Sequence, residues 1–384
     1  MKGSSANVAS SIFVVSVVFG LAACDAQDIP EPGCEGYLGC SAGTRIIPPV
    51  TEAPATTGKI IQPKGVEPTG INAVLPGAGC GKELPADVPL TTPGTPKGYK
   101  QYSVMGTGAT LAQAIARKAG PRTFWVRGPA DYDPEHAYRV VYIGQGCGGY
   151  KIANTNTLPL FKEALNGTEQ AIYVALDIPE DMANMDCYDN RDGLSSQEWE
   201  AFELFHTVVD ENYCVDNNRV YVSGYSTGGW LSNMWGCYFA GDGEHPAGGT
   251  GPRRFAPKYH IRGQAAVTGG EPTEQPACNG PVAAIWIHDI NDNANSIAGS
   301  ISALKRVGKV NGCDTEYGST TNQRPWHPEF KLLGDVCKKF TGCPANYPVV
   351  FCTTSGLFHA DQAARATAAF TAFFAELEPI SAAP

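Results

Sequence analysis

The sequence predicts an α/β fold in which a mostly parallel β-sheet carries helices on both faces. Six short runs rich in valine, isoleucine and aromatic residues recur along the chain, each followed by a loop or an amphipathic stretch. Nearly continuous apolar strands that alternate with helices indicate strands buried on both faces, which is typical of a parallel sheet. The six predicted strands are 138–144, 171–177, 219–224, 263–269, 282–289 and 347–354.

Helical patterns stand between and after these strands. In 195–214, Phe202, Phe205 and Val209 recur at helical spacing. The stretch 226–240 can begin the helix after the third strand, and 361–377 predicts a final helix. The third strand therefore lies between two helices.

Three segments of different composition divide the chain. Residues 1–24 have one lysine, an apolar run and a small-residue ending, which predicts an export signal. Residues 25–78 are rich in proline, threonine and glycine, so we expect a flexible tether, with a small loop closed by Cys34 and Cys40. Residues 79–384 are long enough for one large α/β domain.

The end of the signal also resembles the bacterial lipobox, because Leu21-Ala22-Ala23 precedes Cys24. Two outcomes stay open: a lipid anchor on Cys24 at the outer surface or in the periplasm, or cleavage without lipid and secretion. Of 13 cysteines, 12 remain after Cys24, an even number suited to disulfides in an oxidising compartment. We expect no other contact with a membrane, and the oligomeric state is left open.

Charge and motifs narrow the class of ligand. A net charge of −10 without a basic run argues against nucleic acid and anionic membrane surfaces as partners. The run at Gly144–Gly149 matches a dinucleotide-binding turn, but Asp177, the acidic residue at the end of the next strand, lies farther along the chain than the usual spacing of about 20 residues. Asp289–Asn293 resembles the start of a calcium loop, but Ala294 replaces its glycine. We expect neither a metal ion nor a cofactor.

A nucleophile is predicted at Ser226, in the run "RVYVSGYSTGGW". In a Gly-x-Ser-x-Gly turn between a strand and a helix, the small residues allow a sharp bend that presents the serine at the end of the strand. Gly224 and Gly228 occupy the two small positions. We expect Ser226 to be exposed at this turn.

An acyl-transfer serine needs a base, an acid and donors for the oxyanion. In the α/β-hydrolase fold the acid and then the base follow the serine along the chain, after later strands. Asp292 and Asp289 follow the fifth predicted strand, and His359 follows the sixth. His327 is a weaker candidate base, because a proline follows it and no strand is predicted before it. Thr227 and Cys147 are the predicted oxyanion donors, each through its backbone N–H.

The runs "YDPEHAYRVVYIGQGCGGY" and "YCVDNNRVYVSGYSTGG" resemble the feruloyl esterases and polyhydroxybutyrate depolymerase-like esterases of carbohydrate esterase family 1, within the α/β-hydrolase superfamily. The resemblance spans nearly the whole catalytic domain. It implies that Ser226 is the nucleophile, that Asp292 is the triad acid, with His288 leading its motif, and that 145–149 forms the oxyanion loop.

Three positions depart from the family pattern. Gln145 stands where the family has histidine, Asp289 where it has glycine, and "SGLFH" lacks the usual glycines before the base. Asp289 therefore stays open as an alternative acid. The family's oxyanion-loop cysteine often coexists with a second one, which implies a disulfide between Cys147 and Cys187.

The predicted function is that of an exported serine carboxylesterase acting on feruloyl or acyl esters of plant polysaccharide. A polyhydroxyalkanoate depolymerase is the first alternative, and a non-catalytic binding lipoprotein on a hydrolase scaffold is the second. Aromatic side chains can stack on a phenolic ring or a sugar, although packing in the core is the commoner role. The candidate substrate-binding residues are Gln145, Tyr225, Trp230, Trp235 and Trp326.

Overall fold

The computed structural model describes parts of the chain that all belong to one compact unit, Gly36–Pro384. The described residues are 72–85, 100–104, 122–129, 132–147, 171–177, 195–240, 259–271, 278–327, 337–359 and 363–377. The export signal, the Cys34–Cys40 loop and most of the predicted tether lie outside them.

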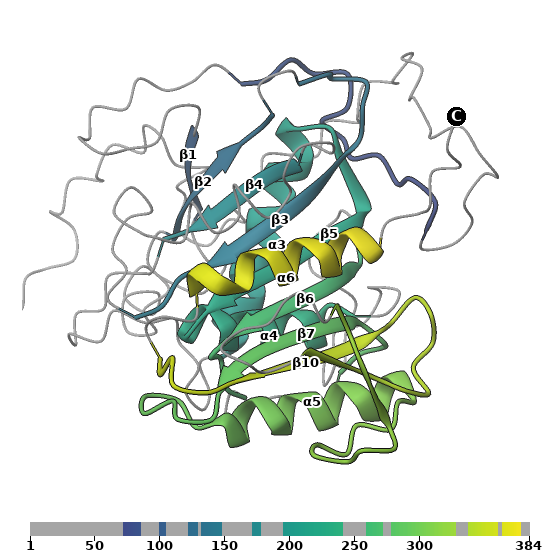
Figure 1. Cartoon of the computed structure of the whole chain (residues 1–384). Helices are drawn as coiled ribbons and strands as arrows, with labels where there is room; N and C mark the ends of the chain where they lie inside the picture. Colours follow the sequence, from purple (N-terminus) through teal and green to yellow (C-terminus); the bar gives the residue numbers. More distant parts are fainter. Residues whose placement is uncertain are drawn as a thin grey trace, which may run out of the picture. The chain divides into compact units, whose positions relative to one another are not determined.

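A 10-stranded mixed sheet forms the centre of this unit, in the order β1-β2-β4-β3-β5-β6-β7-β10-β9-β8 (Figure 1). The six strands from β4 to β10 in this order are parallel, whereas both edges are antiparallel. The strands are β1 Lys100–Val104, β2 Arg122–Arg127, β3 Tyr138–Gly144, β4 Ala171–Leu176, β5 Val215–Tyr225, β6 Ile261–Val267, β7 Ala283–Asp289, β8 Gln323–Pro325, β9 Cys337–Phe340 and β10 Val349–Thr354.

Helices cover both faces of the sheet. On one face, α3 (Ser195–Asn212), α4 (Thr227–Tyr238) and α5 (Ile297–Asn311) share an apolar core with the strands. On the other, α6 (Ala363–Glu376), yellow in Figure 1, buries a row of phenylalanines. The predicted α/β-hydrolase fold, with its mostly parallel sheet, is confirmed.

All six predicted strands are present, but the four edge strands β1, β2, β8 and β9 were not predicted. Each of the six predicted ones lies inside the sheet, where both faces are covered and apolar residues follow one another almost without interruption. β9 has only 4 residues, and its two buried side chains, Cys337 and Phe340, are separated by two lysines that are more exposed. Such short strands have no continuous apolar run that would reveal them.

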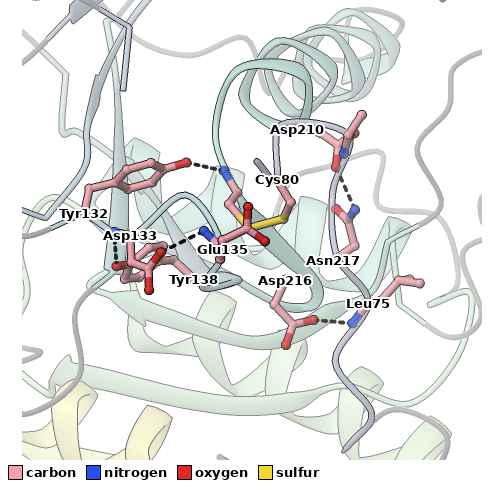
Figure 2. The surroundings of a disulfide bond; sticks show 11 residues. Leu75, Cys80, Tyr132, Asp133, Glu135, Tyr138, Asp210, Asp216 and Asn217 are labelled. Atoms are coloured by element: carbon pink, nitrogen blue, oxygen red, sulfur yellow. Dashed lines mark hydrogen bonds between the residues drawn. A yellow bond between two sulfur atoms is a disulfide. The ribbon is translucent and has the colours of Figure 1, made fainter. Parts of the chain in front are cut away.

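The domain begins earlier than predicted, because 72–82 pack against it as an N-terminal strap (Figure 2). The Leu75 N–H donates to the Asp216 carboxylate at 2.9 Å, and the Ala78 N–H donates to Asp210 at 3.3 Å. Both carboxylates are buried, and burial raises the pKa of each above its ordinary value. The predicted boundary at 78 is therefore wrong, since buried carboxylates hold residues assigned to the tether.

Four disulfides join described cysteines, which is consistent with export to an oxidising compartment. They are Cys80–Cys214, Cys237–Cys278, Cys313–Cys343 and Cys337–Cys352. No described helix is both long and apolar enough to cross a membrane. Likewise, the described residues contain no cluster of histidine, cysteine and carboxylate side chains suited to hold a metal ion.

Removing the Cys80–Cys214 disulfide should destabilise the domain without removing its chemistry. This bond links the strap to the residue before β5 across 134 positions, and both cysteines are buried. A cross-link over so long a loop contributes about 3 to 5 kcal/mol to the free energy of unfolding. We expect the Cys80→Ala/Cys214→Ala double variant to lose about that much in urea unfolding. An unchanged unfolding midpoint would show that the strap is held by its hydrogen bonds alone.

Candidate active site

The turn after β5 places Ser226 between the central strand and α4. Its backbone has φ 55° and ψ −119°, a left-handed conformation that non-glycine residues rarely adopt outside functional turns. Ser226 is only 8% exposed, so the expectation of an exposed serine is wrong. The loops that follow the neighbouring strands cover the turn.

The glycines around Ser226 are required by close approach of the backbone. A Cβ on Gly224 would lie 2.1 Å from the Gly228 carbonyl oxygen, and one on Gly228 would lie 2.2 Å from the carbonyl carbon of Gly144. Both distances are shorter than any side chain tolerates. The Gly-x-Ser-x-Gly pattern therefore lets the start of α4 pack directly against the ends of β3 and β5.

Ser226, His359 and Asp292 form one hydrogen-bonded row, although they come from three separate loops. His359 Nε2 lies 2.9 Å from Ser226 Oγ, and His359 Nδ1 lies 2.9 Å and 3.1 Å from the two carboxylate oxygens of Asp292. The Asp292 side chain is fully buried, and that of His359 is 18% exposed. The order of groups is that of a nucleophile, a base and an acid.

Asp289, the alternative acid, has a different set of partners. Its carboxylate accepts hydrogen bonds from the Asn291 N–H at 2.7 Å, the Leu357 N–H at 2.8 Å and the Thr354 hydroxyl at 3.0 Å. Burial by itself would raise the pKa of Asp289, but these hydrogen bonds outweigh it and hold the pKa below its ordinary value. Asp289 thus ties the loop that carries Asp292 to the loop that carries His359.

His288 is a second histidine that contacts Asp292. Its Nε2 lies 3.0 Å from the Asn295 carbonyl oxygen and 3.3 Å from an Asp292 carboxylate oxygen, and its Nδ1 lies 2.8 Å from Ser300 Oγ. Burial lowers the pKa of His288, which favours the neutral ring. Since the carbonyl and the carboxylate both accept, Nε2 carries the proton and donates to them. Sequence reasoning noted His288 only as part of a motif, because nothing in the sequence shows which groups face its ring.

The loop after β3 runs beside Ser226. A Cβ on Gly146 would come within 2.8 Å of the Tyr225 ring and 3.3 Å of the Ser226 Cβ, so only glycine fits there. The Gln145 carbonyl accepts the Gly228 N–H at 2.8 Å, which joins this loop to α4. Cys147, the next residue, is exposed and disulfide-bonded. Its predicted partner Cys187 lies outside the described residues, as do Gly148 and Gly149.

The other residues predicted to bind substrate are placed in different ways. Gln145 is buried and donates through Nε2 to the Leu176 carbonyl at 3.1 Å. Tyr225 adjoins the row, since its hydroxyl donates to the His359 carbonyl at 3.1 Å and its ring centroid lies 5.2 Å from that of His359. Trp230 is partly exposed in the first turn of α4. Tyr225, the last residue of β5, therefore holds the loop of His359 through a hydrogen bond to its backbone.

Two tryptophans belong to the core, which corrects their assignment as substrate-binding residues. Trp326 is 4% exposed, packs on the α6 face and donates to Glu376 at 2.8 Å. Trp235 is 2% exposed and donates to the Glu198 carbonyl. Each indole N–H is satisfied inside the protein, as large buried aromatic side chains require.

His327 is not part of the row. Its Nε2 lies 2.8 Å from a carboxylate oxygen of Glu376, near the end of α6. A strand does precede His327, contrary to the prediction, because the short strand β8 ends two residues earlier. β8 is the outermost strand of one sheet edge, and there the ring of His327 contacts Glu376 rather than Ser226.

No family model matches the chain. Two curated proteins are similar to it in sequence. Feruloyl esterase C of Emericella nidulans is 24% identical over 256 residues, covering 65% of this chain and 81% of that protein. Feruloyl esterase D of Neurospora crassa is 23% identical over 260 residues, covering 65% and 72%.

Solved structures with a similar arrangement were also found. A ferulic acid esterase from Anaeromyces mucronatus, in complex with ferulic acid, has a TM-score of 0.41 and 16% identity, covering 76% of this chain and 96% of that one. An acetyl xylan esterase from Aspergillus awamori has a TM-score of 0.45 and 10% identity, covering 66% and 94%.

Proposed function

We propose that this chain, a serine carboxylic ester hydrolase similar to feruloyl esterases, cleaves feruloyl or related acyl esters of plant polysaccharide outside the cytoplasm. The observation that carries the proposal is the row in which His359 bridges Ser226 and Asp292. A hydroxyl, an imidazole and a buried carboxylate in this order are the groups that acyl transfer needs. The two sequence relatives are named for feruloyl esters, which supports this substrate class.

In the proposed reaction His359 Nε2 takes the proton of Ser226 as Oγ attacks the ester carbonyl carbon. The imidazolium then gives that proton to the departing alcohol oxygen, and an acyl-serine remains. A water molecule next loses a proton to His359 and attacks the acyl carbon, and the proton returns to Ser226 Oγ as the acid leaves. Asp292 holds Nδ1–H throughout and stabilises the charged ring. His288 in turn keeps Asp292 aimed at that ring.

The oxyanion that forms in both steps is assigned to two backbone donors, the N–H groups of Thr227 and Cys147. Thr227 is the residue after the nucleophile and begins α4, so its N–H belongs to the unpaired donors of a helix N-terminus. Cys147 follows Gly146, whose lack of a side chain lets the loop approach Ser226. A donor acts only if it is aimed beforehand, and the disulfide at Cys147 restrains this loop.

An ester panel tests the substrate class. Methyl ferulate, p-nitrophenyl acetate and a hydroxybutyrate oligomer are offered to the mature protein, with the Ser226→Ala variant as the blank. We expect methyl ferulate to give the highest kcat/KM. Preferred release of hydroxybutyrate would favour a polyester depolymerase instead, and no turnover of any ester would contradict the proposal.

We also propose a lipid anchor on Cys24. Metabolic labelling with a palmitate analogue in a bacterial host should mark the full-length protein and miss Cys24→Ala, because the thiol is the attachment point. Ester hydrolysis in the culture serves as the control for expression of both forms. An unlabelled wild-type protein would contradict the lipid anchor and favour cleavage without lipid, followed by secretion.

A further inference from the structure

Asn295 contacts three other parts of the site, each through a different polar group. Its backbone N–H donates to Asp292 Oδ1 at 2.9 Å, and its carbonyl accepts from His288 Nε2 at 3.0 Å. Its side-chain Nδ2 donates to the Thr268 carbonyl at 2.7 Å, across 27 positions of the chain. Since a carbonyl can only accept, it is the amide nitrogen of Asn295 that faces Thr268. Asn295 therefore joins the loop of Asp292 to the residue that follows β6.

Thr268 is held between the turn at Ser226 and the loop of Asn295. The carbonyl of Val267, the last residue of β6, accepts the Ser226 N–H at 2.9 Å. The Thr268 N–H donates to the Ile287 carbonyl at 2.9 Å. Thr268 is fully buried and has a φ of 46°, a left-handed conformation that is unusual for a β-branched residue. Such a conformation persists only where the surrounding contacts fix the residue, and the hydrogen bond from Asn295 is one of these contacts.

These contacts form a second connection between Ser226 and Asp292 that does not pass through His359. It runs from the Ser226 N–H through the end of β6 to Thr268. From there the side chain and backbone of Asn295 continue it to the Asp292 carboxylate. His359 bridges the same two residues through its ring, at 2.9 Å from Ser226 Oγ and 2.9 Å from Asp292 Oδ2. The space that this ring fills is therefore set in part by Asn295.

We propose that Asn295 is a positioning residue, whose side-chain amide holds Asp292 at the distance from Ser226 that the ring of His359 requires. The proposal rests on the proposed function, because it gives Asn295 a part in the same acyl transfer. Since the amide binds the backbone of Thr268, its effect on the reaction passes through Asp292. An acid that is aimed beforehand stabilises the imidazolium without first moving, and a displacement of about 1 Å can lower the rate about 100-fold.

The test measures kcat, KM and the melting temperature of Asn295→Ala with p-nitrophenyl acetate. Alanine removes the amide but keeps the backbone N–H that donates to Asp292 and the carbonyl that accepts from His288. We expect kcat to fall about tenfold, less than a displacement of about 1 Å would cost, because the other hydrogen bonds of Asp292 stay. KM should stay within about twofold, since the lost interaction acts on the chemical step. Asn295→Asp keeps the size but places an oxygen opposite the Thr268 carbonyl, so it should lower kcat at least as much.

Asn293→Ala is the matched control, because Asn293 is an exposed asparagine two residues earlier in the same loop, and it should retain the wild-type kcat. A second measurement repeats Asn295→Ala in the Asp292→Asn background, with the rate of Ser226→Ala subtracted. There the further loss should be less than about twofold, because effects that pass through the same group are not additive.

A wild-type kcat in Asn295→Ala would overturn the positioning role while the esterase stands. A lower melting temperature with an unchanged kcat would mean that Asn295 serves the fold alone. A further loss of about tenfold in the Asp292→Asn background would show that Asn295 does not act through Asp292, and it too would overturn the proposal. If the wild type cleaves no ester, the proposed function and the positioning role fall together.

Discussion

Replacing Ser226 with alanine should lower ester hydrolysis by about 10⁴- to 10⁶-fold, because the nucleophile, the base and the acid act as one unit. Only the Oγ atom is lost, together with its 2.9 Å hydrogen bond to His359. The change in stability should stay near 1 kcal/mol, the typical contribution of one hydrogen bond. Initial rates on p-nitrophenyl acetate and a thermal melt of the same preparation give both quantities.

Because Ser226 is mostly buried, a small change in stability cannot be expected from exposure. It is expected because alanine fits the same space and keeps the same backbone strain, since both residues carry a Cβ at φ 55°. Activity at a tenth or more of wild type would show that Ser226 is not the nucleophile. Ser223→Ala, three residues earlier in β5, is the matched control and should retain activity.

Asp292→Asn should lower kcat by about 10⁴-fold at neutral pH, the loss expected when a triad acid becomes an amide. The amide cannot stabilise the imidazolium, and its NH₂ group favours the wrong tautomer of His359. The backbone N–H groups of Ala294 and Asn295, each 2.9 Å from Asp292 Oδ1, can still donate hydrogen bonds to the oxygen of the amide. The fold should therefore survive, and pH–rate profiles with a chemical unfolding curve provide the measurement.

Asp289→Asn is the matched comparison, because it is the other aspartate of the same loop. Its carboxylate accepts three hydrogen bonds, and two of them, from Thr354 and Leu357, join the two loops; we therefore expect a loss of about 2 kcal/mol in stability and a smaller loss of kcat than for Asp292→Asn. A larger loss of kcat in Asp289→Asn than in Asp292→Asn would mean that Asp289 is the triad acid and that Asp292 has the structural role.

The pH dependence of stability provides a second difference between the wild type and Asp289→Asn. The folded protein holds the pKa of Asp289 below its ordinary value, so the unfolded chain binds the proton more readily. The resulting stability is present above the unfolded pKa, near 4, and is lost as the pH falls towards the folded pKa. The Asp289→Asn variant should therefore lose less stability than the wild type as the pH falls. If the two proteins gave identical acid unfolding curves, after correction for the midpoint at neutral pH, the lowered pKa of Asp289 in the folded protein would be contradicted.

Chain order accounts for how much of the site was predictable. The turn at Ser226 is a local feature, because Gly224 and Gly228 stand at fixed distances from it in the sequence. His359 could be preferred over His327 from its place after a predicted strand. The choice between Asp289 and Asp292 could not be made, since they lie in one loop and only the directions of their side chains distinguish them.

What the sequence determined by itself is the set of buried parallel strands, the strand-turn-helix at Ser226 and the order of serine, acid and base. These are properties of local spacing and apolar pattern. The tertiary structure decided the partner of His359, the fastening of the two loops by Asp289, the inclusion of 72–82 in the domain and the burial of Trp326. Each of these depends on contacts between residues far apart in the chain, and no local pattern records which distant backbone N–H or side chain a carboxylate will meet.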